Sequence, residues 1–298
     1  MIIKNSKVNK EYKINKIIYE NPENGVICGL AYEREAKLCF VKTISYGGLS
    51  KQDVKYVKDM AEREANSIRK AKICSEKVPK LIDYIDDKKN ERIVIVMEKM
   101  KGTTLREWME AKPLTKVTSK DLFLRSQIVK QVAEILWSIN RKNPGIVHRD
   151  LKPENIFIAF NEENHRWEVS IVDFGCASLN HIRNVGTANY QSPEQQKRYN
   201  MSVAISHKTD VFALGKIFYE LLTGYLPKQG IDYRIKQSET KWNTTPELPD
   251  DILRLEHGAT INELIKSMTA FSVDDRCGYD RIVGELKFKS KIKSRRKQ

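Results

Sequence analysis

The sequence predicts an α+β fold in which strands and helices occupy separate parts of the chain. Short apolar runs of strand length, separated by polar turns, fill much of residues 12–97. From residue 121 onward, apolar residues recur at three- and four-residue spacing, which is the period of a helix. The first part is therefore expected to form a mostly antiparallel sheet, and the second part is expected to be mostly helical.

Residues 12–43 are predicted to form an antiparallel meander. The dipeptide Asn24-Gly25 is a strong signal for a tight hairpin turn, and apolar runs follow it at 26–28 and 38–41. Two further strands are predicted over residues 81–85 and 92–97, joined by a charged turn.

A helix with one apolar stripe is predicted between these strands. Glu64 lies beside the stripe, four residues before Ile68, and is the predicted partner of Lys42 at the end of the preceding strand. Glu62 is the alternative partner, but its own fourth neighbour is Asn66, which would not pack into a core. The stripe consists of Val54, Val57, Ala61, Ala65, Ile68 and Ala71.

A loop between residues 146 and 157 combines an imidazole, an acid, a base and an amide. A long amphipathic helix precedes it and is expected to stop at Asn143-Pro144-Gly145, while Pro153 disfavours a helix within the loop. Short strands are predicted on its far side, at 156–158 and 169–172. The loop reads Ile146-Val147-His148-Arg149-Asp150-Leu151-Lys152-Pro153-Glu154-Asn155-Ile156-Phe157.

Several further motifs follow in a fixed order. Asp173-Phe174-Gly175 ends a predicted buried strand, Ser192-Pro193-Glu194 closes the next loop, and Asp210 begins a helix that is apolar nearly all round. With Lys42, Glu64, the His-Arg-Asp loop and the late Arg276, this set resembles the eukaryotic-type Ser/Thr protein kinases over residues 12–287.

The resemblance implies a bilobal protein-kinase-like fold. A small, mostly antiparallel N-terminal lobe with one key helix would bind nucleotide over residues 1–97. The hinge and a larger, mostly helical lobe would carry catalysis and substrate binding over residues 98–286. Residues 287–298 would form a basic, disordered tail.

The resemblance also implies an ATP- and Mg²⁺-dependent transfer of the γ-phosphoryl group to protein Ser or Thr hydroxyls. Asp150 would take the proton of the acceptor, Lys152 would bring a cation to the phosphoryl group, and Asn155 and Asp173 would hold the metal. Lys152 together with Thr187 is similar to the pattern of Ser/Thr rather than Tyr specificity. His148 is expected to be structural, and Arg276 is expected to pair with Glu194.

The implied nucleotide contacts depart from the family in its glycine-rich loop. Of the pattern G-x-G-x-x-G-x-V, Gly25 is the remaining glycine and Ile27 takes the valine position, while Glu20 and Pro22 replace the first two glycines. The other implied contacts are Lys42 with Glu64 at the phosphates, and Met97, Glu98 and Met100 around the adenine.

These departures support a second hypothesis, a pseudokinase or scaffold with weak ATP binding. Phe40 strengthens it, because the family places a small residue, usually alanine, at this position against the adenine. A kinase for small molecules is disfavoured by Thr187 and Ser-Pro-Glu, and a primary nucleic-acid binder would rest on charge alone. The segment 179–185 holds no hydroxyl, so activity is predicted not to need phosphorylation there.

Composition predicts a soluble, cytoplasmic protein. The 298 residues with 40% hydrophobic content can bury a large core, no apolar run reaches the roughly 18 residues of a membrane span, and the start lacks the apolar stretch of a signal peptide. The five cysteines are spread without C-x-x-C spacing and are expected to be reduced thiols.

The formal charge of +14 gathers partly in residues 287–298. A polyanion, either nucleic acid or an anionic membrane surface, is therefore a candidate partner of this tail, against the simpler reading of a solvated end. The sequence leaves the oligomeric state open.

Overall fold

The structure is a computed structural model that describes residues 1–5, 10–33, 37–177, 186–196, 204–227 and 247–288. It divides into two compact units. The first comprises Met1–Lys101 and Ser170–Ser178, and the second comprises Gly102–Val169 and Leu179–Gln298. The boundary lies after Lys101, close to the predicted boundary after Met97, and the segment with Asp173 joins the first unit.

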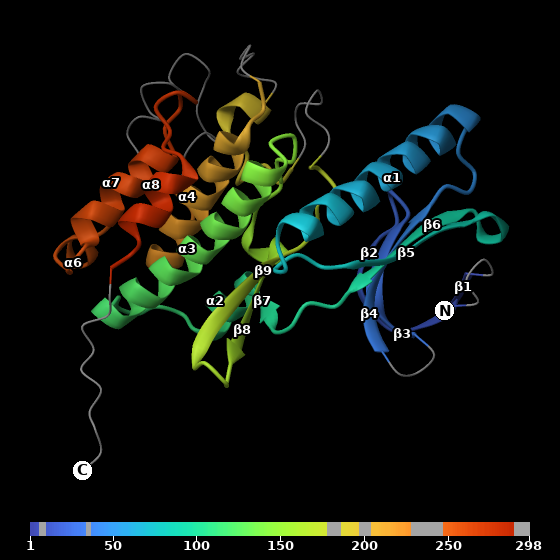
Figure 1. Ribbon diagram of the computed structural model, residues 1–298, viewed down its shortest axis with the longest axis horizontal. Coiled ribbons are helices and arrows are strands. Elements are labelled where there is room, and N and C mark those ends of the chain that lie inside the picture. Colours follow the sequence, from blue (N-terminus) through green and yellow to red (C-terminus); the bar gives the residue numbers. More distant parts are fainter. Residues whose placement is uncertain (6–9, 34–36, 178–185, 197–203, 228–246, 289–298) are drawn as a thin grey trace. The chain divides into compact units, whose positions relative to one another are not determined.

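The first unit is built on a six-stranded antiparallel sheet (Figure 1). The order of its strands is β1-β2-β3-β4-β6-β5. This confirms the predicted sheet and adds the short N-terminal strand β1, which was not predicted. The strands are β1 Ile2–Asn5, β2 Lys10–Asn21, β3 Val26–Glu33, β4 Lys37–Ser45, β5 Leu81–Asp87 and β6 Arg92–Glu98.

Buried and less buried side chains alternate along β4, so one face of the sheet packs on the core and the other does not. Cys39, Val41 and Thr43 are buried on the core face, so Phe40 and Lys42 lie on the other face. β1 exists because it contributes Ile3 to the core. The core cluster consists of Ile3, Tyr12, Ile14, Ala31, Cys39, Val41, Ile85, Val94 and Val96.

Helix α1, Lys51–Cys74, packs against β5 and β6. Its N-cap is Ser50, whose side chain accepts a hydrogen bond from the backbone N–H of Asp53. Four of the six residues of the predicted stripe are buried, and Glu64 is buried with them while Glu62 is exposed. The buried apolar members are Ala61, Ala65, Ile68 and Ala71.

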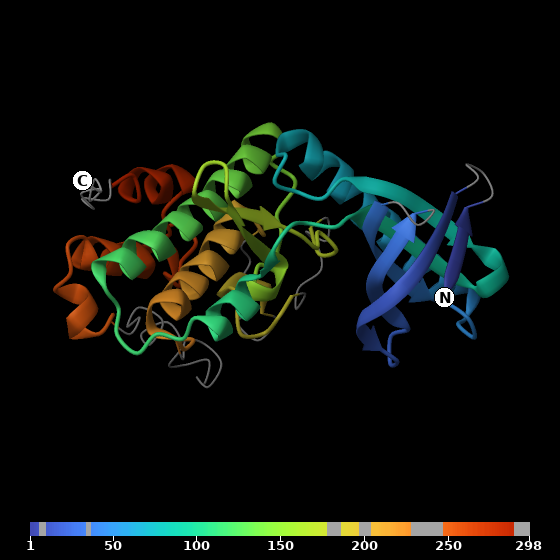
Figure 2. The ribbon, with the colours of Figure 1, turned by 90° about the horizontal axis from the view of Figure 1, so that it is seen from below.

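The second unit is mostly helical, as predicted. Helix α4 packs against α3 and α7, and α3 packs against α8, so these helices lie side by side in both ribbon views (Figures 1 and 2). A three-stranded sheet, β7-β8-β9, completes the unit. Its elements are β7 Thr103–Thr104, α2 Leu105–Ala111, α3 Ser119–Lys142, β8 Ile156–Asn161, β9 Arg166–Ile171, α4 His207–Thr223, α6 Asp250–Leu253, α7 Gly258–Met268 and α8 Tyr279–Glu285.

Helix α4 is buried on nearly every side, which agrees with its apolar sequence. A Cβ atom added at Gly215 would come within 2.8 Å of the Met268 Cβ and 2.7 Å of the Thr269 Cγ2. The glycine therefore permits the close approach of α4 to the end of α7. Asp210 lies in the first turn of this rigid helix, where it can hold the loop beside it.

The loop 146–157 contains one short helical turn that was not predicted. Pro153–Asn155 form a 3-10 helix with Pro153 in the first turn. A proline is tolerated there because its missing N–H would have no partner in the helix anyway. The turn brings Asn155 back toward the loop backbone that precedes it.

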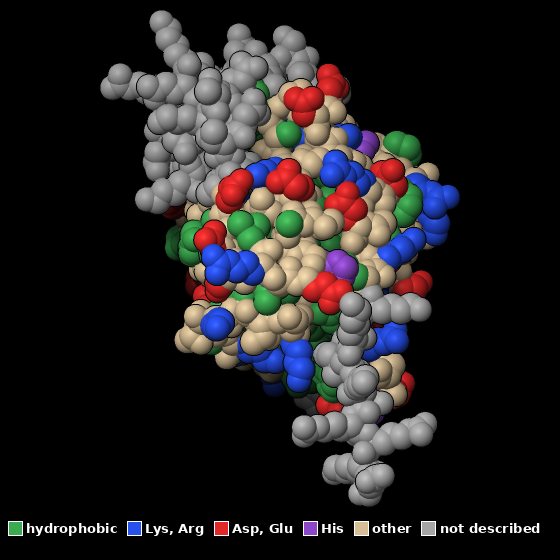
Figure 3. Space-filling model, turned by 90° about the vertical axis from the view of Figure 1, so that its left-hand side faces the viewer, with side chains coloured by type: hydrophobic (Ala, Val, Ile, Leu, Met, Phe, Trp, Pro, Cys, Tyr) green, Lys and Arg blue, Asp and Glu red, His purple; other side chains and the backbone are tan. Residues whose placement is uncertain are grey.

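All five cysteines lie within the described ranges, where they form no disulfide. Within these ranges, no helix is both long enough and apolar enough to cross a membrane. On the face shown in Figure 3, Lys and Arg side chains are interspersed with Asp and Glu side chains. The predictions about the segment 179–185 and about the tail beyond Phe288 fall outside the described residues.

Candidate active site

The second unit holds the carboxylate of Asp150 in a network of donors. Its Oδ1 accepts hydrogen bonds from the backbone N–H of Thr187 at 2.7 Å and from the Thr187 hydroxyl at 2.8 Å. Lys152 donates to the same hydroxyl at 2.8 Å, and its Nζ lies 3.2 Å from Asp150 Oδ2. The three side chains predicted to define acceptor chemistry are therefore in direct contact.

Asn155 is buried beneath this network. Its amide nitrogen donates to the backbone oxygen of Asp150 at 2.9 Å and approaches Asp150 Oδ2 at 3.4 Å. The amide nitrogen is thus engaged with Asp150, which leaves the amide oxygen as the atom that can serve a cation.

Backbone contacts from two directions fix the loop that carries Asp150. The carboxylate of Asp210 accepts from the backbone N–H groups of His148 and Arg149, each at 2.8 Å. Asp210 therefore holds the backbone of the loop just before Asp150. Arg149 has a φ of 67°, a strained conformation for a non-glycine residue, and a Cβ atom at Gly186 would lie 2.5 Å from its carbonyl oxygen. His148 is buried, as expected for a structural residue.

A buried ion pair anchors the segment that follows Thr187. Arg276 donates to the two carboxylate oxygens of Glu194 at 2.6 Å and 2.7 Å, and both side chains are completely buried. The Thr209 hydroxyl adds a third bond to Glu194 at 2.8 Å. The predicted pair is confirmed, and it ties the segment to the base of α4.

The first unit pairs Lys42 with Glu64, as predicted. Lys42 Nζ lies 2.8 Å from both carboxylate oxygens of Glu64. Burial lowers the pKa of Lys42, but the carboxylates of Glu64 and Asp173 outweigh burial and raise it above its ordinary value. Lys42 is therefore a cation at any physiological pH.

Asp173 lies next to this ion pair. Its φ is 62°, a strained conformation like that of Arg149, and its Oδ1 accepts from the backbone N–H of Gly175 at 3.2 Å. A Cβ atom at Gly175 would lie 3.3 Å from the Glu64 carboxylate. The absence of a side chain at Gly175 lets the Asp-Phe-Gly turn approach α1.

The strand register places Ile27 on the face of the sheet opposite to that of Lys42. Cys28 pairs with Lys42 across β3 and β4, whereas Ile27 pairs with the buried Thr43 on the core face. Directly opposite residues share a face of a sheet, so Cys28 and not Ile27 accompanies Lys42. Burial raises the pKa of the Cys28 thiol to about 11 despite the nearby Lys42.

Gly25 has a structural reason to be glycine. Its φ is 63°, and a Cβ atom there would come within 2.9 Å of the Ser45 Cβ. The turn and the close approach of β4 thus account for this residue without a nucleotide. Its role in nucleotide binding stays a prediction.

The predicted adenine contacts lie at the end of β6. Met97 is buried and pairs with Phe40 across β4 and β6, so both side chains are on the face that carries Lys42. Glu98 gives its backbone N–H to the carbonyl of Lys80 at 2.8 Å. Met100 is half-buried in the segment that follows.

Sequence reasoning missed a charged cluster in the second unit. Arg106 contacts Glu154, Glu220 and Tyr190. The available signal was Glu220, an acid near the end of a mostly apolar, buried helix, because a buried carboxylate needs a partner.

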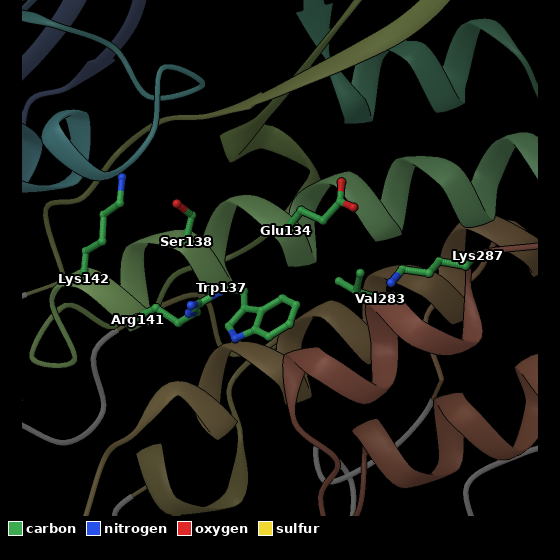
Figure 4. A pocket seen from close by; sticks show the side chains of 7 residues that line it. All are labelled: Glu134, Trp137, Ser138, Arg141, Lys142, Val283 and Lys287. Atoms are coloured by element: carbon green, nitrogen blue, oxygen red, sulfur yellow. The ribbon is translucent and has the colours of Figure 1, made fainter.

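A separate cavity of about 480 Å³ lies between α3 and α8 (Figure 4). None of the predicted site residues lines it, so it is not part of the candidate active site. Its lining residues are Glu134, Trp137, Ser138, Arg141, Lys142, Val283 and Lys287.

Comparison with known proteins assigns the family. Residues 23–286 match the family model described as protein kinase domain. The chain is 31% identical over 203 residues to the serine/threonine-protein kinase PrkC of Bacillus subtilis, covering 62% of this chain and 28% of that protein. It is 32% identical over 179 residues to the mitogen-activated protein kinase kinase SIPKK of Nicotiana tabacum, covering 58% and 44%.

A third relative matches over a longer stretch. The probable serine/threonine-protein kinase nek2 of Dictyostelium discoideum is 25% identical over 280 residues, which is 91% of this chain and 62% of that protein. The chain therefore spans less than two thirds of each of these three relatives. Because the family model covers most of its length, the chain belongs to the protein kinase domain family.

Proposed function

We propose that this chain is a Mg²⁺- and ATP-dependent Ser/Thr protein kinase. The observation that carries the proposal is the Asp150 carboxylate held between Lys152 and Thr187. This arrangement leaves a carboxylate beside a cation, which is what the transfer of a phosphoryl group to a hydroxyl needs. The relatives named as serine/threonine-protein kinases support the acceptor class.

The chain's own groups divide the work in the proposed reaction. Asp150 orients the acceptor hydroxyl and takes its proton. Thr187 fixes the Asp150 carboxylate by donating two hydrogen bonds to Asp150 Oδ1. Lys152 brings a positive charge to the oxygens of the group being transferred. Because Thr187 binds both Asp150 and Lys152, it sets the separation of the base and the cation.

The donor chemistry of two further residues fits Mg²⁺. Asp173 offers a carboxylate, and the amide oxygen of Asn155 is left for a cation by the bond from its nitrogen to Asp150. Such hard oxygen ligands suit Mg²⁺, which when bound neutralises charge on the phosphate oxygens of ATP. Lys42, held by Glu64, would bind the α- and β-phosphates.

Lys42→Met and Asp173→Asn test this nucleotide half of the proposal. Lys42→Met removes the cation proposed to bind the phosphates, and Asp173→Asn removes the negative charge of a proposed Mg²⁺ ligand, so we expect kcat/KM to fall by about a hundredfold or more in each variant. The measurement is steady-state phosphoryl transfer to a Ser/Thr peptide as ATP is varied. Lys70→Met, an exposed lysine on α1, is the matched control and should retain wild-type kinetics. Unchanged kcat/KM in both variants would contradict these assignments.

A scaffold with weak ATP binding is the second candidate, and Phe40 is the observation that favours it. Its ring shares a face with Lys42 and lies opposite Met97, where the adenine is expected. An extra large side chain in a closely packed site typically costs about 1–3 kcal/mol, which corresponds to roughly ten- to a hundredfold in affinity.

Phe40→Ala is therefore expected to tighten ATP binding by about tenfold or more. Calorimetric titration of both forms with Mg·ATP measures the change, and Phe160→Ala, an exposed phenylalanine on β8, serves as the control. Tight binding by the wild type that Phe40→Ala leaves unchanged would show that the ring does not occupy the pocket. Phosphoryl transfer by the wild type at saturating ATP separates a kinase with weak nucleotide affinity from a scaffold.

A further inference from the structure

The guanidinium of Arg106 on α2 is surrounded by acceptors from three other segments. Its Nε lies 2.9 Å from Glu154 Oε1, and its Nη1 lies 2.7 Å from Glu220 Oε1 on α4. Its Nη2 donates to the hydroxyl of Tyr190 at 2.7 Å, and that hydroxyl donates to Glu220 Oε2 at 2.7 Å. The guanidinium of Arg106 thus contacts two carboxylates and donates a hydrogen bond to a phenol hydroxyl.

The cluster is next to the proposed acceptor site along two separate routes. Glu154 belongs to the same 3-10 turn as Asn155, which binds the backbone of Asp150. The backbone N–H of Tyr190 donates to the carbonyl of Thr187 at 2.9 Å, and Thr187 binds the Asp150 carboxylate. Residues of a substrate that flank an acceptor hydroxyl at Asp150 would therefore pass close to Arg106.

The cluster is open to solvent on one side. The side chain of Glu154 is 45% exposed and that of Arg106 is 26% exposed, whereas that of Glu220 is only 6% exposed. Burial lowers the pKa of Arg106, but hydrogen bonds to Glu220 and Glu154 raise it above its ordinary value. Arg106 thus lies over Glu220 as a permanent cation.

Arg106 contacts Glu154 and Glu220 in the way that a basic side chain of a bound substrate would contact them. A guanidinium contacting carboxylates through separate N–H groups is how proteins recognise arginine and how arginine recognises acids. Without Arg106, the two carboxylates would lose the cation that contacts both of them, and Glu220 would keep only the charge interaction with the buried Lys216 on its own helix among the described residues. The two carboxylates would then attract a basic residue of the substrate.

We propose that Arg106 determines substrate specificity by occupying the carboxylate pair of Glu154 and Glu220, so that this kinase accepts Ser/Thr sites without basic flanking residues. This inference rests on the proposed kinase function. It assigns the substrate class as acceptor segments that are neutral or acidic near the hydroxyl. Arg106 acts by excluding a charge, and the reacting groups remain Asp150 and Lys152.

The test measures kcat/KM for a set of peptides with one serine acceptor. A neutral parent peptide is compared with versions in which one arginine is moved through the positions on either side of the serine. The wild type should show no preference for arginine at any position. Arg106→Leu should gain about tenfold or more for arginine at one or two positions, since a pair of close opposite charges is worth at least that when partly desolvated.

Three further variants separate specificity from structure. Arg106→Lys keeps the positive charge and should keep the wild-type preference. Arg106→Gln removes the charge but retains donors for Glu220 and Tyr190, so it replaces Arg106→Leu if the latter does not fold. Adding Glu154→Gln to the neutral variant should remove much of the gain for arginine, which a role confined to joining α2 and α4 would not explain.

Several outcomes would overturn the inference. One is a wild type that already prefers arginine by about tenfold or more at a flanking position. Another is a neutral Arg106 variant that phosphorylates the parent peptide but gains nothing for arginine. The two proposals can also fail separately. If the wild type phosphorylates no peptide, the proposed kinase function is refuted. If it nevertheless binds the arginine-containing and neutral peptides equally, the exclusion of basic residues by Arg106 remains supported by that comparison of binding.

Discussion

Asp150→Asn is expected to lower kcat for phosphoryl transfer by about a hundredfold or more, because the amide cannot take the proton of the acceptor hydroxyl. The substitution is nearly isosteric. The hydrogen bonds from Thr187 to Oδ1 can persist with an amide oxygen, so the loop should keep its shape. ATP affinity should remain close to that of the wild type, because the proposed phosphate contacts come from other residues.

Three measurements together make this prediction specific: kcat from peptide phosphorylation, the ATP dissociation constant, and the midpoint of thermal unfolding. Asp251→Asn is the matched control, since it makes the same chemical change at an exposed carboxylate on α6. A loss of kcat that is accompanied by a lower unfolding midpoint would point to structure rather than proton transfer. A normal kcat in Asp150→Asn would remove Asp150 from the catalytic assignment.

Arg276→Met is expected to reduce the free energy of unfolding by about 3–5 kcal/mol, the usual cost of leaving one charge of a buried pair without its partner. Glu194 would keep a carboxylate in a completely buried position with only Thr209 as a side-chain donor. The carbonyls of Ala270 and Phe271, which accept from Arg276, would also lose a donor. Urea unfolding measures the loss.

A control variant and a double variant test whether the loss comes from the unpaired buried charge. Arg281→Met breaks a more exposed ion pair with Glu285 and should cost about 0–1 kcal/mol. Adding Glu194→Met to Arg276→Met should recover part of the loss, because no buried charge then remains. If Arg276→Met costs no more than Arg281→Met, the buried pair does not anchor the segment.

The same pair has a defined pH dependence. Burial raises the pKa of Glu194, but Arg276 and the other donors outweigh burial and lower it below its ordinary value of 4.5. A group whose pKa is depressed by folding stabilises the protein above the unfolded-state pKa and loses that contribution as pH falls. The difference in stability between wild type and Arg276→Met should therefore shrink below about pH 4.5.

The sequence predicted those site residues whose positions follow from local periodicity. Glu64 could be identified because it lies beside the apolar stripe of one helix, and Lys42 because it ends an apolar strand. Asp210 and Arg276 came from the order of motifs, which the structure joins to His148, Arg149 and Glu194.

The sequence could not determine which face of the strand carries Ile27. A shift of one residue moves a side chain to the opposite face of a strand, and a motif with only one of its glycines left does not fix the register. The register is set by the pairing of β3 with β4, which places Cys28 opposite Lys42.

Long-range contacts account for the other omissions. Strand β1 is too short to show a period, and it is held by the burial of Ile3 in the core and by hydrogen bonds from Asn5 to Asp83. Arg106, Glu154, Tyr190 and Glu220 come from four different segments, so no local pattern connects them.

The most direct test of the central claim is phosphate incorporation into a protein substrate from ATP labelled at the γ-position, in the presence of Mg²⁺. The wild type is measured beside Asp150→Asn at saturating ATP, and the modified residues are identified by mass spectrometry. We expect phosphoserine or phosphothreonine with the wild type, and at most about a hundredth of that rate with Asp150→Asn. Equal incorporation by both proteins, or none by the wild type, would contradict it.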